Sequence, residues 1–141
     1  MSQTKGRVMN DYESKVKDFH DAFDLGVALP FSAELLRLRK TLIHEEAQEL
    51  FEELDRAVAE MQEKGVVSKE TQMNLMKEMA DLQYVLSGTA VVFGLPVERV
   101  FDRVHDSNMS KLDAEGKPLR REDGKILKGP LYHPPQLDDL L

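Results

Sequence analysis

The chain has 141 residues, of which 41% are hydrophobic and 32% are charged, and its formal net charge is −7. This length and apolar content predict one folded domain, and the acidic balance argues against a protein that coats nucleic acid, because phosphate binding needs a basic face. With zero cysteines, no apolar run near the roughly 20 residues of a membrane span and no signal-peptide core in MSQTKGRVMN, we expect a soluble cytoplasmic protein without disulfides, thiol chemistry or membrane contact.

The first half of the chain predicts two helices. Pro30 separates them, because proline breaks a helix interior. Ser32 is suited to cap a long second helix that reaches about residue 63 and stops at Gly65. The first helix, over about residues 9–24, is indicated by large side chains at helical spacing, namely Tyr12, Val16, Phe19 and Phe23.

Two more helices are expected after residue 65. Ser68 is a candidate cap for a helix over about 69–93, and the Gly-Leu-Pro break at 94–96 separates it from a fourth helix that ends near Lys111. Each helix carries an apolar stripe, which we expect to face inward. Four helices with short links predict an all-α antiparallel four-helix bundle.

Beyond Leu112 the helical period is lost and the chain becomes rich in Gly and Pro. Asp123-Gly124 lies between short apolar runs and predicts a small hairpin or turn. Residues 111–134 carry six Lys/Arg and four Asp/Glu, a local charge of +2. We therefore expect a single domain over 1–141, made of a helical bundle over about 9–112 and an irregular tail over 113–141.

Carboxylates interrupt the apolar stripes of the second and third helices. Glu46 and Glu49 are three residues apart, as are Glu78 and Asp81, so each pair lies on one helix face. Burial would bring like charges together in a medium of low dielectric, which is costly without a compensating cation. The carboxylates predict a site for two or more Mg²⁺ or Mn²⁺ ions, because hard cations take oxygen ligands. Glu45, next to these ligands, is a candidate to deprotonate the attacking water.

The sequence leaves two alternatives to this metal site. Di-iron bundles use Glu-x-x-His motifs, and the sequence offers only Asp102-x-x-His105, with no second copy. His44 points away from the acidic face and is interpreted as outward. Ordinary solvated acids on a Glu-rich helix are the other alternative, which is weakest for Glu78 in the middle of its stripe.

The sequence resembles the all-α nucleoside triphosphate pyrophosphohydrolases. Glu-x-x-Glu at 46–49, followed after 28 residues by Glu-x-x-Asp at 78–81, is similar to the metal signature of that superfamily. LRKTLIHEEAQEL at 38–50 is similar to the first MazG-like motif, and residues 101–135 are similar to the C-terminal block of a MazG-like branch with some dUTP-hydrolysing members. The resemblance covers about residues 16–135.

The resemblance implies hydrolysis of a nucleoside triphosphate, with dUTP favoured, to a monophosphate and pyrophosphate. It implies that Glu46, Glu49, Glu78 and Asp81 are the metal ligands and that Glu45 assists the water. Alternatives are phosphoribosyl-ATP hydrolysis, or a non-enzymatic acidic helical interaction module.

Further residues are predicted to contact the substrate. Asn108 and Lys111 are expected near the nucleotide, with helix C-capping as the alternative. The tail supplies positive charge for the phosphates and a tyrosine that would pack on a base or on the core; these residues are Arg121, Lys125, Lys128 and Tyr132.

The resemblance places the base pocket near the end of the first helix. His20 and Phe23 are therefore candidate base contacts, although Phe23 could be a core aromatic and His20 a surface residue. Because Glu78 shares its stripe with large apolar residues, the third helix needs neighbours on more than one face. We expect a homodimer with close helix approach at Gly88 and Thr89.

Overall fold

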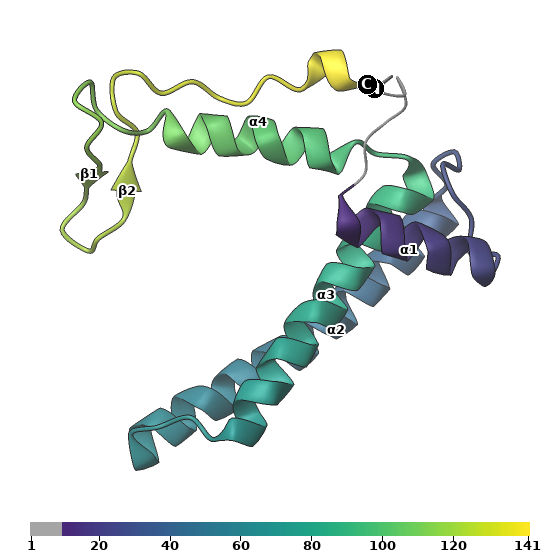
Figure 1. Ribbon diagram of the computed structural model, residues 1–141, viewed down its shortest axis with the longest axis horizontal. Coiled ribbons are helices and arrows are strands. Elements are labelled where there is room, and N and C mark those ends of the chain that lie inside the picture. Colours follow the sequence, from purple (N-terminus) through teal and green to yellow (C-terminus); the bar gives the residue numbers. More distant parts are fainter. Residues whose placement is uncertain (1–9) are drawn as a thin grey trace, which may run out of the picture. The chain divides into compact units, whose positions relative to one another are not determined.

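The computed structural model describes residues 10–141 and is mainly helical. Four α-helices follow one another along the chain (Figure 1): α1 (Asp11–Ala22), α2 (Ala33–Lys64), α3 (Lys69–Phe93) and α4 (Val97–Met109). Two short strands, β1 (Leu119–Arg120) and β2 (Ile126–Leu127), and a 3₁₀ turn, η1 (Asp138–Leu140), complete the fold. The predicted all-α class and its four helices are confirmed.

The helix ends follow local capping chemistry. The side chains of Ser32 and Ser68 accept hydrogen bonds from the amides of Leu35 and Thr71, so the predicted N-caps of α2 and α3 are confirmed. Gly65 closes α2 with a positive φ of 72°, a conformation that glycine adopts without steric cost.

The outer helices are shorter than expected. Helix α1 begins at Asp11, capped by the Asn10 side chain, and ends at Ala22 instead of residue 24; the predicted start at residue 9 lies outside the described residues. Helix α4 ends at Met109, two residues before the predicted Lys111.

The chain divides into two compact units, one ending at Leu95 and one running from Pro96 to Leu141. The single domain expected over 1–141 stays a prediction. Within residues 10–141, no single helix is long and apolar enough to cross a membrane; α3 and α4 taken together pass on length and composition alone, as the core helices of soluble proteins also do.

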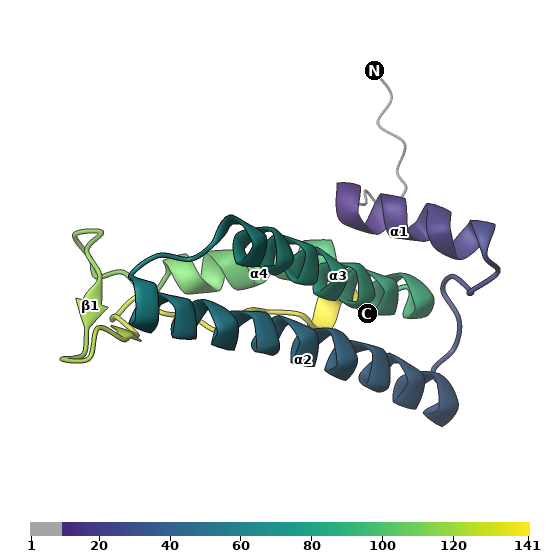
Figure 2. The ribbon, with the colours of Figure 1, turned by 90° about the horizontal axis from the view of Figure 1, so that it is seen from below.

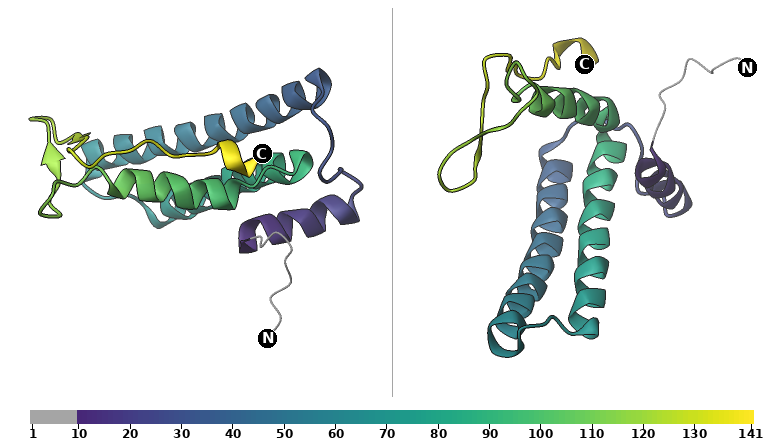
Figure 3. Two further views of the ribbon diagram at one scale, coloured as in Figure 1. Left: turned by 90° about the horizontal axis from the view of Figure 1, so that it is seen from above. Right: turned by 60° about the vertical axis from the view of Figure 1, so that its left-hand side comes forward.

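In the first unit, α2 and α3 lie side by side as an antiparallel helical hairpin, and α1 packs on α3 (Figures 2 and 3). The loop between α1 and α2 is fixed to the end of α3, because the amides of Ala28 and Leu29 donate to the carbonyls of Val91 and Val92 at 3.0 and 2.7 Å. The buried apolar core of this unit is small and comprises Val16, Ala90, Val91, Val92 and Phe93.

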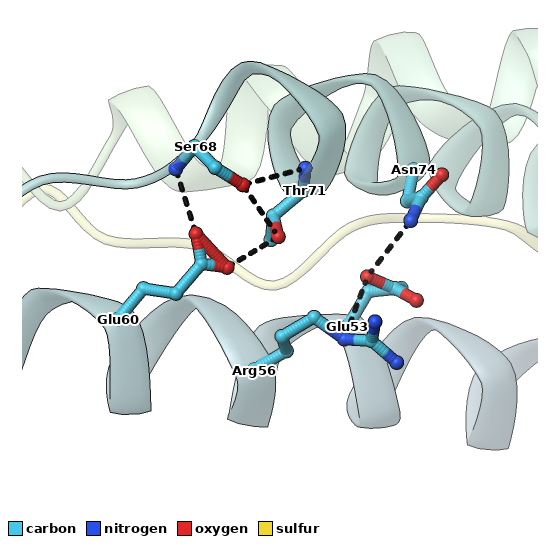
Figure 4. A network of polar contacts seen from close by, with 6 residues as sticks. All are labelled: Glu53, Arg56, Glu60, Ser68, Thr71 and Asn74. Carbon is cyan, nitrogen blue, oxygen red and sulfur yellow. Dashed lines mark hydrogen bonds and ion pairs between the residues drawn. The ribbon is translucent and has the colours of Figure 1, made fainter.

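Polar contacts set the register between α2 and α3 (Figure 4). The Glu60 carboxylate accepts a hydrogen bond from the amide of Ser68 at 2.7 Å and another from the hydroxyl of Thr71. Further along the hairpin, Asn74 Nδ2 donates to Glu53 Oε2 at 3.5 Å. The end of α2 therefore extends past the start of α3, and this offset decides which residues of the two helices meet.

Large parts of the expected inward stripes are solvent exposed. On α2, Leu54, Val58 and Met61 are 44%, 54% and 50% exposed. The prediction that these stripes face inward is wrong for one isolated chain, because α3 covers only one side of α2. An apolar face is left open.

In the second unit, the predicted hairpin is present. Leu119 pairs with Leu127 and Arg120 with Ile126, and Gly124 takes a φ of +88° in the turn. The chain then returns along α4, where Arg103 Nη1 donates to the carbonyl of Gln136 at 2.7 Å. The irregular tail is thus anchored to the helix that precedes it.

Candidate metal centre

The structure brings four carboxylates together between α2 and α3. Glu46 and Glu49 lie on one face of α2, and Glu78 and Asp81 lie on the facing side of α3. Each offers one carboxylate oxygen, and these oxygens all lie within 4.8 Å of one another. The two acid pairs predicted from spacing therefore form one cluster.

The cluster is electrostatically crowded. Glu46 and Glu78 each have one buried Oε2 atom without a hydrogen-bond partner among the described residues. The charge of Glu46, followed by a hydrogen bond with Glu78, raises the pKa of the Glu49 carboxyl above its ordinary value. Unsatisfied buried oxygens and like charges both destabilise the folded chain unless a cation neutralises them.

The donor set fits a hard divalent cation. All four groups are carboxylates, and within residues 10–141 no histidine belongs to the cluster. Mg²⁺ and Mn²⁺ prefer such oxygen ligands, whereas zinc and iron sites usually include nitrogen or sulfur. The unpartnered Oε2 atoms of Glu46 and Glu78 are free to act as ligands. The cluster could therefore hold metal ions of this class, and the histidine-containing di-iron alternative finds no support.

Lys77 supplies positive charge at the edge of the cluster. Its Nζ lies 2.7 Å from Asp81 Oδ2 and 3.4 Å from Glu78 Oε1. The hydrogen bond to Asp81, together with that carboxylate's charge, raises the pKa of the Lys77 ammonium. Sequence reasoning missed this residue, although its position four residues before Asp81 is a spacing at which side chains meet on a helix.

Glu45 lies beside the cluster but is not part of it. Its side chain is exposed on α2, so water reaches it directly. His44 is exposed as well, in agreement with its outward interpretation. The role of Glu45 as a base stays a prediction.

The candidate base contacts near the end of α1 differ in environment. His20 is 3% exposed, and its Nδ1 lies 2.9 Å from the carbonyl oxygen of Gly26. It is therefore not a surface residue. Phe23 is 64% exposed and packs on Phe19 with 4.5 Å between ring centroids, so it is not a core aromatic in this chain.

A buried arginine was also missed by sequence reasoning. Arg39 is 8% exposed, and its Nε and Nη2 atoms donate to Thr89 Oγ1 and to the carbonyl of Val85 at 3.0 and 2.8 Å. Burial lowers the pKa of its guanidinium. The sequence feature that indicates burial of Arg39 is its position four residues before Ile43, on the apolar stripe of α2. Arg39 fixes α2 against α3 two helical turns from the carboxylates.

The residues of the second unit that are predicted to contact the substrate interact with their near neighbours in the sequence. Asn108 is exposed, contrary to its expected inward position, and its carbonyl accepts from the amide of Lys111 at 3.2 Å. Arg121 is ion-paired with Asp123, so its charge is already compensated. The remaining contacts are the amide of Lys125, which donates to Asp123 Oδ1 at 3.1 Å, and Lys128 Nζ, which lies 4.6 Å from the ring centroid of Tyr132.

An apolar groove of about 390 Å³ lies between α1 and α3. Its lining begins at Met79 and Ala80, the neighbours of Glu78 and Asp81 in the sequence, and includes Tyr84 one turn further along α3. The rings of Tyr84 and Phe19 contact edge to face at 5.6 Å. Sequence reasoning did not predict this groove, which forms only where α1 packs on α3.

Comparison with known proteins identifies the family to which the chain belongs. The sequence profile of the phosphoribosyl-ATP pyrophosphohydrolase family matches residues 16–108, a range that contains all four carboxylates. Among solved structures, the chain is similar to the crystal structure of a proposed NTP pyrophosphohydrolase from Exiguobacterium sp. 255-15, with 27% identity, a TM-score of 0.44, and coverage of 91% of this chain and 90% of that one. No curated protein matches the chain. The chain belongs to the phosphoribosyl-ATP pyrophosphohydrolase family, within the nucleoside triphosphate pyrophosphohydrolases.

Proposed function

We propose that this protein is a divalent-metal-dependent hydrolase that cleaves a nucleoside triphosphate, with dUTP favoured, to the monophosphate and pyrophosphate. The observation that carries the proposal is the cluster of four carboxylate oxygens within 4.8 Å of one another. A site with this much negative charge repels a triphosphate unless cations lie between the two. Such a site therefore suits a substrate that binds together with metal ions.

Glu46, Glu49, Glu78 and Asp81 would hold two or more Mg²⁺ or Mn²⁺ ions. When bound, such ions neutralise charge on the phosphate oxygens and polarise the phosphoryl group that is attacked. The chain's own task is to hold the four carboxylates in fixed positions. Hydrogen bonds of Glu60 with Ser68 and of Glu53 with Asn74 help to hold the carboxylates in place, because they fix α2 and α3 relative to each other.

Glu45 is proposed as the base. Its carboxylate is exposed beside the cluster and in contact with solvent, so it can accept the proton of a water molecule. The water oxygen forms a new bond to phosphorus, the bond between the α and β phosphates breaks, and pyrophosphate leaves with the electron pair. Glu45 takes the proton that the water gives up.

The nucleoside is proposed to lie in the groove between α1 and α3. The groove is lined by Tyr12, Met79 and Tyr84, and Met79 lies next to Glu78 in the sequence. Aromatic rings and methionine provide an apolar surface on which a base can stack. His20 and Phe23, the base contacts expected from the resemblance, do not line this groove.

The second unit is proposed to contact the phosphates. Lys111, Lys125 and Lys128 carry no carboxylate partner among the described residues, whereas Arg121 is paired with Asp123. Lysine side chains without a partner are the better candidates for an incoming anion. Asn108 is exposed and can contribute its amide, and Tyr132 lies beneath Lys128.

Two substrates are supported by different observations. The C-terminal block over residues 101–135 resembles a branch with dUTP-hydrolysing members, which favours dUTP and a role in sanitising the cytoplasmic nucleotide pool. The family profile that matches residues 16–108 favours phosphoribosyl-ATP. Phosphoribosyl-ATP carries a second ribose with its own phosphate, so it needs a larger and more basic pocket than dUTP does.

A homodimer is proposed as the working assembly. The exposed apolar side chains of Leu54, Val58 and Met61 on α2 support it, because monomers rarely expose a continuous apolar helix face. A second copy packed on this face would bury the stripe.

The test is direct. The purified protein is incubated with dNTPs, NTPs and phosphoribosyl-ATP, with Mg²⁺ or Mn²⁺, and the products are separated. We expect monophosphate and pyrophosphate, with dUTP or phosphoribosyl-ATP turned over fastest. The control is the Glu78→Gln variant, which separates this activity from that of a contaminating phosphatase. No pyrophosphate from any substrate with either metal would refute the proposal.

A further inference from the structure

Lys77 forms ion pairs with two of the carboxylates that belong to the candidate metal site. Lys77 Nζ lies 2.7 Å from Asp81 Oδ2 and 3.4 Å from Glu78 Oε1, and both carboxylates belong to the cluster. The Lys77 side chain is 67% exposed, so packing does little to hold it in this position. Its place is set by the charge of the two acids.

A divalent ion and the Lys77 ammonium cannot both occupy the cluster without strong repulsion. Metal ligands of this class lie at roughly 2.0–2.6 Å from the ion, and Nζ lies 2.7 Å from an oxygen of the same Asp81 carboxylate. The two positive centres would then be a few ångströms apart, where Coulomb repulsion is large. Because the lysine stem is exposed and flexible, it can swing into solvent at small cost.

A single ammonium leaves most of the cluster uncompensated. Among the described residues, the ion pairs of Lys77 are with the two acids of α3, and the buried Oε2 atoms of Glu46 and Glu78 have no hydrogen-bond partner. The single positive charge of Lys77 thus reduces the repulsion among the four carboxylates but does not neutralise them.

We propose that Lys77 is an internal cation that balances the Glu78–Asp81 pair in the metal-free protein and is displaced when a divalent ion binds. This inference rests on the metal site of the proposed function. It assigns to Lys77 a role outside the ligand set: it lowers the affinity of the site for metal and stabilises the folded chain when metal is scarce.

The test measures metal binding without substrate. Mn²⁺ is titrated by calorimetry into the full-length protein and into Lys77→Met, Lys77→Arg and Lys69→Met. Lys69 is the matched control, since it is an exposed lysine with no ion pair among the described residues and lies eight positions earlier on α3, about 12 Å along the axis. The same variants are heated with and without Mn²⁺.

We expect Lys77→Met to bind Mn²⁺ about three- to tenfold more tightly than the wild type, from the loss of one ion pair and of the repulsion. Lys77→Arg should keep the affinity of the wild type, and Lys69→Met should change it by less than about twofold because salt screens a charge at that distance. The increase in Tm caused by Mn²⁺ should be largest for Lys77→Met.

Two results would overturn the inference in different ways. If Lys77→Met bound Mn²⁺ no more tightly than Lys69→Met did, Lys77 would not compete with the metal, and the metal site would stand. If neither the wild type nor any variant bound Mn²⁺, the metal site itself would fall, and the proposed function with it.

Discussion

The guanidinium of Arg39 occupies the space directly above Gly88. A Cβ atom built at position 88 would lie 2.5 Å from Arg39 Nη2 and 3.2 Å from His20 Nε2. Because the carbonyl of Gly26 can only accept a hydrogen bond, His20 Nδ1 carries the proton, and in the neutral ring Nε2 is an acceptor on the side of Gly88. Residues of α1, α2 and α3 therefore meet where α3 has no side chain.

Gly88→Ala is expected to destabilise the protein by about 1–3 kcal/mol, as overpacking of a buried site does. Glycine to alanine within a helix normally stabilises by about 0.5–1 kcal/mol, so the sign of the effect identifies the close contact. The free energy of unfolding is measured with urea, assuming a two-state transition.

A second variant separates the contact from general disturbance of α3. In an Arg39→Ala background the obstructing side chain is absent, so Gly88→Ala should cost less, with a coupling on the order of 1 kcal/mol between the two positions. Additive effects would show that Arg39 adjusts freely to a larger residue 88.

Glu60 is expected to make stability depend on pH. Hydrogen bonds from the Thr71 hydroxyl and the Ser68 amide lower the pKa of its carboxyl from 4.5 to about 2. A carboxyl whose folded pKa is depressed stabilises the fold above its unfolded pKa, and this contribution is lost as the pH falls through the folded pKa. Glu60→Gln should therefore lower the Tm at pH 7, and its difference from the wild type should shrink between pH 4.5 and about pH 2.

The control for this experiment is Glu63→Gln. Glu63 is an exposed acid on the same helix, without an ion pair or hydrogen bond among the described residues. It should leave both the Tm and its pH profile close to those of the wild type. Equal pH profiles for the Glu60→Gln variant and the wild type would show that the hydrogen bonds of residue 60 stabilise the fold equally without the carboxylate charge.

The helix boundaries could be predicted because they depend on neighbouring residues. Ser32 and Ser68 cap helices through amides three residues away, and Gly65 ends one by its own backbone conformation. The inward stripes could not be predicted, because a stripe shows that a face is apolar and not what covers it. Val58, for example, belongs to such a stripe but is 54% exposed, because α3 does not cover that side of α2.

Spacing alone predicts the four carboxylates as two pairs, and their meeting in one metal site is predicted from the need for a compensating cation and from the resemblance. Spacing of three residues places Glu46 with Glu49 and Glu78 with Asp81. Whether the pairs meet depends on the offset between α2 and α3, which the contact of Glu60 with Thr71 helps to set across the turn. Lys77 was missed although it lies four residues before Asp81, because a single Lys–Asp pair at this spacing is common on exposed helix faces.

Glu78→Gln should abolish turnover while the protein remains folded. Metal ions contribute several kcal/mol to stabilising transition-state charge, so loss of a ligand is expected to lower kcat on the order of 100-fold or more. Without metal, the variant should be at least as stable as the wild type, because the Glu78 carboxylate has a buried oxygen without a partner and faces other acids.

Glu52→Gln is the matched control for this substitution. Glu52 is an exposed acid on α2 outside the cluster, and its replacement makes the same change in net charge. Pyrophosphate release and the Tm in the presence of a chelator are measured for both variants. Full activity of Glu78→Gln would refute the assignment of this carboxylate as a ligand.

The open apolar face of α2 predicts that the protein associates through it. Burying Val58 against a second copy would remove apolar surface from water, worth roughly 25 cal/mol per Å². Val58→Glu should therefore weaken a dimer, since a charge buried at its centre has no partner. Light scattering after size exclusion gives the mass of each species over a range of concentrations. Val66→Glu is the control, because Val66 is similarly exposed, at 59%, but lies in the loop after α2. A wild-type protein that stays monomeric and fully active would show that this face is covered by another part of the chain or serves a different partner.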